Sequence, residues 1–116
     1  MSKKIVIIPA EGEPYIEDIK GDFVDYDTLS SNVGGWIECV GLEQDLDLWV
    51  NEEGKLNGLP FNPLATLLWM NYFGPTDMIM GNAIITAGVD ENGETLGFTE
   101  EDAQSFTAML GAISNE

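Results

Sequence analysis

The segment over 57–74 constrains the fold most, because it joins a punctuated loop to the most apolar run of the chain. Asn62 is a suitable N-cap, Pro63 fits the first helical position, and Gly74 followed by a proline is a stop signal. Only two of the residues from Leu64 to Phe73 are polar, so apolar side chains surround the helix axis. The sequence therefore predicts a buried helix that must be covered.

Shorter patterns on both sides of this helix predict strands. A continuous apolar run predicts a buried strand at 3–9, and a mixed run predicts an edge strand at 15–20. Along 46–51, apolar residues alternate with Asp47, Trp49 and Asn51, which we expect to face solvent. The other expected strands are 36–42, a return over 56–59 that completes a meander, and 78–87 with a bulge at Gly81-Asn82.

Two further helices are expected. Asp25 or Asp27 caps a short helix that ends at Gly34. Its apolar residues Leu29 and Val33 lie four positions apart, on one face. The second helix begins after Thr99, and its apolar positions are Ala103, Phe106, Leu110 and Ile113. The chain is thus predicted to form a single α+β domain over 1–116. Its mostly antiparallel sheet of about five strands is packed by the central apolar helix and the C-terminal amphipathic helix.

The chain is strongly acidic, with 21 Asp and Glu residues against 4 Lys, no His, and a net charge of −17. Nucleic acids and anionic membranes are bound through Lys and Arg, so we expect direct binding to neither. From Leu56 to Val89 the only charged residue is Asp77, and the other carboxylates lie before and after this segment. An uncharged central module is therefore enclosed by acidic outer segments.

Several short motifs carry a family resemblance. They are Val33-Gly34-Gly35-Trp36-Ile37-Glu38, Val50-Asn51-Glu52-Glu53-Gly54-Lys55, Gly58-Leu59-Pro60, Asn62, Ala65-Thr66, Asp77, Ile79 and Gly81. Their order and spacing, over roughly 1–97, resemble the family called domain of unknown function 3846. The resemblance implies an origin in a bacteriophage or another mobile element, but it implies no activity and transfers no functional residue. Members often carry basic residues where this chain has Pro63 and Leu64, so the resemblance assigns no anion binding to this loop.

Catalytic and metal-binding sites would lack their usual residues here. Without His and Arg, the commonest general base and the bidentate clamp for phosphate or carboxylate are both absent. Cys39 is the only cysteine, which suits a reducing compartment, and we expect it to be a buried, inert thiol in a strand. The acidic segment 90–94 has its glycine too early for a calcium-binding loop, so a turn is expected. We expect no enzyme, no cofactor and no metal site.

The cellular location is inferred from two short apolar runs. Only four apolar residues precede Pro9, too few for the core of a signal peptide. The run over 64–73 is about half of the roughly twenty residues that span a bilayer. We therefore expect the cytoplasm, which is the host cytoplasm if the gene belongs to a phage.

The acidic surface is the feature from which function is inferred. We expect a non-enzymatic accessory protein that binds a basic host protein, including the case in which carboxylates imitate DNA phosphates and block a nucleic-acid site. The candidate partner-binding residues are Glu43, Asp45, Asp47, Trp49, Glu52, Glu53, Asp22, Asp25 and Asp27. Trp49 is either such a contact or is covered by a neighbouring helix. The alternatives are a surface that serves only solubility, a small-ligand or carboxylate-based enzymatic module, and a homo-oligomer that exposes part of the central helix.

Overall fold

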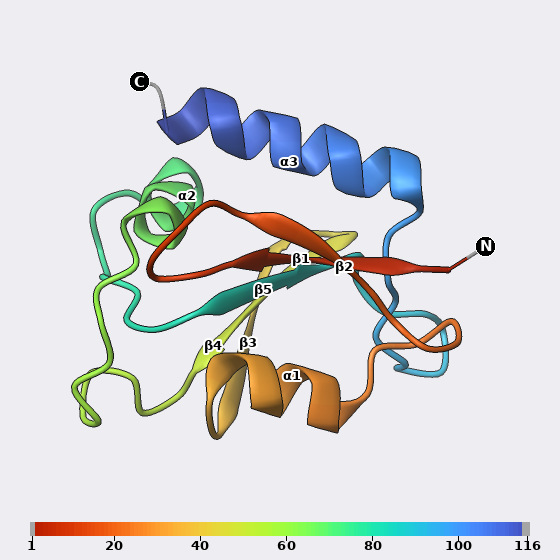
Figure 1. Cartoon of the computed structure of the whole chain (residues 1–116), viewed down its shortest axis with the longest axis horizontal. Helices are drawn as coiled ribbons and strands as arrows, with labels where there is room; N and C mark the ends of the chain where they lie inside the picture. The colour runs from red at the N-terminus through yellow and green to blue at the C-terminus, as the bar shows by residue number, and fades with distance from the viewer. Residues whose placement is uncertain (1, 115–116) are drawn as a thin grey trace.

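A computed structural model describes residues 2–114 as a five-stranded antiparallel sheet with helices on both faces (Figure 1). The strands are β1 (Lys4–Ile8), β2 (Tyr15–Asp18), β3 (Ile37–Glu43), β4 (Leu46–Asn51) and β5 (Ala83–Thr86). The helices are α1 (Tyr26–Val33), α2 (Pro63–Phe73) and α3 (Glu100–Ser114). The strand order β2-β1-β5-β4-β3 places the last strand of the chain in the centre of the sheet. The predicted α+β class and the five-stranded sheet are confirmed.

Two apolar cores explain why β1 is a continuous apolar run. Val6 and Ile8 belong to the larger core, which the sheet forms with α2 and α3. Ile5 and Ile7 point to the other face and belong to a smaller core beneath α1. Because both faces of β1 are covered, the strand carries no polar alternation. The prediction of a buried first strand is confirmed, and β2 lies at the edge of the sheet as expected.

The start of α2 follows the predicted signals. Asn62 is the N-cap, and its side-chain oxygen accepts the Ala65 N–H at 3.0 Å. The side-chain nitrogen of Asn62 is fully buried and donates to the Ile8 carbonyl at 2.8 Å and to the Gly81 carbonyl at 2.9 Å. One residue therefore caps the helix and bonds it to the end of β1 and to the segment that leads into β5.

The other two helices also begin where the sequence predicts. Asp25 caps α1 by accepting the Thr28 N–H at 2.8 Å, and α1 ends at Gly34. Thr99 accepts the Asp102 N–H at 3.1 Å at the start of α3. The buried residues of α3 are the predicted Ala103, Phe106, Leu110 and Ile113. None of the helices within residues 2–114 has the length and hydropathy needed to cross a membrane.

The outer side of α2 differs from the prediction. Ala65 and Leu68 are fully buried in the larger core, so one side of the helix is covered. Leu67, Met70 and Phe73 on the other side keep 39%, 41% and 40% of their surface exposed. Within the chain the predicted buried helix is therefore covered on one side only, because the sheet and α3 pack against that side.

The prediction that one side of β4 faces solvent is also wrong. In Figure 1, α1 lies across the face of the sheet opposite to α2 and α3. Trp49 is partly buried against the core beneath α1, and its indole N–H donates to the Thr86 hydroxyl at 2.8 Å. Asn51 is buried on the same side. Trp49 and Asn51 form hydrogen bonds inside the protein, and the sequence alternation alone cannot distinguish such residues from ones that face solvent.

The last strand is shorter than predicted. We expected 78–87, whereas β5 covers only Ala83–Thr86. Gly81 interrupts the strand with a positive φ of 90°, and its N–H donates to the Pro60 carbonyl. A side chain at this φ would be strained, and a Cβ at Gly81 would also displace a methyl group of Leu59, so the position favours glycine. The expected bulge is therefore a break, and the residues before it are free of the sheet.

The expected return strand over 56–59 is likewise wrong. Residues 52–58 form consecutive turns, and the Asn57 N–H donates to the Glu53 carbonyl at 2.8 Å. The β3–β4 hairpin is therefore not extended into a meander. A compact turn region carries the chain from β4 to α2 instead.

Replacing Asn62 tests whether it holds the fold together. Asn62→Ala removes the cap and leaves two buried carbonyls without their donor, so we expect a loss of about 3 kcal/mol in the free energy of unfolding. Urea denaturation of the wild type and the variant measures this difference in the free energy of unfolding. Asp25→Ala, which removes only an exposed cap, is the control and should cost less than half as much. Equal losses for the two variants would contradict the role of Asn62.

Candidate functional site

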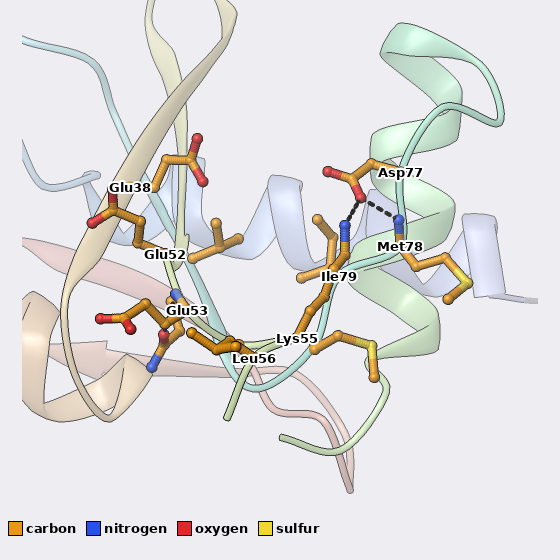
Figure 2. A pocket seen from close by; sticks show the side chains of 12 residues that line it. Glu38, Glu52, Glu53, Lys55, Leu56, Asp77, Met78 and Ile79 are labelled. Atoms are coloured by element: carbon orange, nitrogen blue, oxygen red, sulfur yellow. Dashed lines mark hydrogen bonds and ion pairs between the residues drawn. The ribbon is translucent and has the colours of Figure 1, made fainter. Parts of the chain in front are cut away.

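An open pocket of about 250 Å³ lies where β3 begins, β4 ends and the segment before β5 passes close by (Figure 2). We call it the acidic pocket, because its lining includes the carboxylates of Glu38, Glu52, Glu53 and Asp77. Lys55 is its only basic lining residue. Val50 and Ile79, which are buried, contribute apolar surface. The pocket thus combines negative charge with an apolar floor.

Buried contacts hold the walls of the acidic pocket together. The side chain of Asn51 donates to the Val33 carbonyl at 3.1 Å and accepts the Glu53 N–H at 2.8 Å. Gly54 lies against the segment before β5, where a Cβ would be only 2.7 Å from the Met80 carbonyl oxygen. A larger residue at Gly54 would push this backbone away. The glycine therefore permits the two walls of the pocket to approach each other.

The charges in the acidic pocket are only partly balanced. Lys55 donates to the Asp77 carboxylate, which also accepts the Met78 N–H at 2.8 Å. The bond from Lys55, followed by that from Met78, lowers the pKa of Asp77 below its ordinary value. Glu38 and Glu52 lie across the pocket from Asp77 (Figure 2). Four carboxylates and one ammonium group give this pocket a formal charge of −3 at neutral pH.

Large apolar side chains lie exposed beside these charges. Leu56 is 82% exposed and Met78 is 55% exposed, and both line the pocket. Trp36 precedes β3 and is 65% exposed, and its carbonyl accepts the Glu52 N–H at 2.9 Å. Exposed aromatic and apolar residues at a concave surface are typical of contact sites.

The predicted partner-binding acids lie in separate places. Glu52 and Glu53 line the acidic pocket. Glu43 and Asp45 lie at the opposite end of the β3–β4 hairpin and line a different hollow. Tyr72 of α2 donates its hydroxyl hydrogen to Glu43, and burial together with this bond raises the pKa of Tyr72 to about 12. Glu43 therefore contacts α2 and is not a free surface charge.

The third group of predicted acids lies near the start of α1. Asp22 is exposed in the loop before the helix, and Asp25 and Asp27 line a hollow together with Lys20. The hydrogen bonds from Thr28 to the Asp25 carboxylate lower its pKa. Apart from Asp47, the predicted acids thus lie in three separate regions.

Cys39, Asp47 and Trp49 lie together on the side of the hairpin that faces α1. Cys39 is exposed on the edge strand β3, so the expectation of a buried thiol is wrong. Partial desolvation and the nearby Asp47 carboxylate nevertheless raise the pKa of this thiol to about 11. Burial also raises the pKa of Asp47. Trp49 is partly buried, which leaves it little surface for contact with a partner.

Of the residues that line the acidic pocket, only Glu52 and Glu53 were predicted as site residues, and the prediction missed the carboxylates of Glu38 and Asp77 and the exposed side chains of Leu56 and Met78. Asp77 carried a signal, because it is the only charge between Leu56 and Val89. Leu56 carried another, as a lone apolar side chain in a polar turn. Neither signal gives the distance between the hairpin and the segment before β5. Among residues 2–114, no three His, Cys, Asp or Glu side chains are grouped so that they could hold a metal ion.

The fold and the pocket define a small acidic α+β protein with an open, carboxylate-lined pocket. A family model described as "Domain of unknown function (DUF3846)" matches residues 2–111, and the chain belongs to this family. The resemblance is therefore confirmed, and the match extends beyond the expected limit near 97 into α3. Comparisons with curated proteins and with solved structures give no match.

Some of the motifs that carry the family resemblance lie at the acidic pocket, whereas Asn62, Ala65-Thr66 and Gly81 lie elsewhere. The segments 33–38 and 50–55 are joined there by Asn51, and Asp77 and Ile79 contribute to the opposite wall. Several of these residues have structural roles, such as the close approach of Gly54 to the 77–80 segment. The family motifs therefore support the geometry of this pocket as well as lining it.

The raised pKa of Cys39 gives a direct test of its surroundings. At pH 8 the folded chain should react with iodoacetamide about a hundredfold more slowly than the urea-unfolded chain, because the thiolate is the reactive form. The alkylation rate should rise towards a midpoint near pH 11. Asp47→Asn should shift this midpoint downward, since it removes a negative charge beside the thiol. A folded chain that reacts as fast as the unfolded one at pH 8 would contradict the raised pKa of Cys39.

Proposed function

We propose that the protein is a non-enzymatic accessory protein that binds a basic protein, with the acidic pocket as the principal contact. The observation that carries this proposal is the presence of four carboxylates and two strongly exposed apolar side chains, Leu56 and Met78, at one open pocket. Carboxylates attract a basic segment, and exposed apolar residues supply contact area once it has docked. The pocket offers both.

The distribution of lysines supports attraction over long range. Lys4 pairs with Asp18 and Glu100, and Lys55 pairs with Asp77. Half of the lysines are therefore already engaged, while the net charge is −17. A field of this sign accelerates the approach of a basic protein and is screened by salt.

Trp36 supports local recognition. Its exposed ring lies at the start of β3, two residues before Glu38. If an Arg or Lys side chain of the partner contacts this ring, a cation–π contact adds about 0.5–1 kcal/mol at an exposed site. We therefore expect the partner to contribute a segment in which basic and apolar residues alternate.

The family resemblance adds the biological setting to this proposal. We place the protein in the cytoplasm of a host cell, encoded by a phage or another mobile element, and we take a host protein as its partner. In the DNA-mimic form of the proposal, the carboxylates occupy a nucleic-acid site of that partner. Duplex DNA should then compete with the protein for the partner. If DNA does not compete, the protein binds the partner at a surface other than its nucleic-acid site.

Capture from host lysate at 50 mM NaCl, followed by elution along a salt gradient, tests the proposal. The wild-type chain should retain basic proteins that elute as salt rises. The triple variant Glu38→Gln, Glu52→Gln, Glu53→Gln should bind the captured protein at least about tenfold more weakly, because it removes three pocket charges. Leu56→Ser should weaken binding with little change in its salt dependence.

A matched control separates the pocket from the general field. The triple variant Glu91→Gln, Glu94→Gln, Glu101→Gln removes the same charge from exposed positions away from the pocket and should bind nearly as well as wild type. Equal losses in the two triple variants would overturn the pocket as the principal contact. Retention of no basic protein at low salt would overturn the function itself.

A further inference from the structure

The outer side of α2 is a second surface that the proposed function does not use. Phe61 precedes the helix, and Leu67, Met70 and Phe73 follow one another at intervals of three residues along it. Each of the four is about 40% exposed. We call these four residues the α2 face. Phe61 and Met70 also line an open groove, which Pro75 extends.

The apolar surface of this face is comparable to the largest patch on a typical soluble monomer. At this exposure the four side chains leave on the order of 300 Å² of apolar surface, a size at which a patch on a monomer is commonly functional. A helix that is apolar on all sides is normally buried on all sides. The sheet and α3 cover only the side with Ala65 and Leu68, so the outer side of this helix is open to contact with another molecule.

The charge around the α2 face indicates which kind of molecule binds it. The segment from Leu56 to Val89 has one formal charge, Asp77, and Lys55 neutralises it at the edge of the groove. A basic protein would find no carboxylate on the α2 face to attract it. A second copy of this chain would be repelled by most of the surface, since each copy carries −17, but not by this neutral face.

We propose that two copies of the chain associate through their α2 faces in a symmetric dimer. In a two-fold contact the same surface lies on both copies, so a charged face would meet its own charge. The neutral α2 face meets no like charge. The two faces with their rims would bury on the order of 1,000 Å² in total, which lies at the low end of specific interfaces. The dimer keeps the carboxylates of both copies at its periphery.

Salt separates this contact from binding of a basic protein. Added salt screens the repulsion between two acidic copies, so it should strengthen the dimer, whereas it weakens attraction to a basic partner. Sedimentation velocity of the full chain from 1 to 200 μM, at 50 and 500 mM NaCl, measures this. The dimer fraction should rise with concentration and be larger at the higher salt.

Two variants locate the contact. Met70→Glu places a charge on the α2 face and should weaken the dimer at least tenfold, while Leu67→Ser should weaken it less. Ser105→Glu adds the same charge to an exposed position in the first half of α3 and should dimerise as the wild type does. Circular dichroism verifies that each variant is folded.

A monomeric mass at all concentrations and both salts would overturn the proposal and indicate that a different protein covers the α2 face. A dimer that folded Met70→Glu leaves unchanged would also overturn it, because the contact would then lie elsewhere. Either result leaves the capture of a basic protein at low salt as a separate question.

Discussion

The buried side chain of Asn62 joins three parts of the chain that are distant in sequence. It caps α2, and its amide group binds the last carbonyl of β1 and the Gly81 carbonyl. Its backbone N–H also donates to the Ile79 carbonyl at 2.8 Å. The segment before β5 is thereby held against the start of α2, and it presents Asp77 to the turn that carries Lys55. The acidic pocket depends on this arrangement, because one of its walls is that segment.

Elements whose signals lie within a few residues could be predicted from the sequence. The caps Asp25, Asn62 and Thr99 bind N–H groups only three positions further along the chain, so their residue types were sufficient. The cover over each element could not be predicted in the same way. The alternation along β4 indicated solvent where α1 lies, and the apolar surround of α2 indicated burial where the chain offers none. The periodicity of a sequence shows which side chains are apolar. What covers those side chains depends on tertiary and quaternary contacts, which the periodicity does not give.

The acidic pocket was predictable only in part, for the same reason. Glu52 and Glu53 were recognised as acids in a turn, whereas Asp77 and Met78 reach the pocket through the contact of Gly54 with the Met80 carbonyl. The total charge indicated an electrostatic function, but it could not say where carboxylates and apolar side chains meet. The resulting surface has two distinct regions, an acidic pocket with exposed anchors and a neutral α2 face. They predict opposite responses to salt.

The central claim is that a basic partner binds at the acidic pocket. A titration of the ¹⁵N-labelled chain with the basic protein captured at low salt, followed by NMR, tests it most directly. The largest chemical-shift changes should fall on 36–38, 52–56 and 77–80, which surround the pocket. The amides of 43–46 at the hairpin tip and of 22–28 before α1 should change little. Changes concentrated in either of those acidic regions, with the pocket unaffected, would contradict the claim.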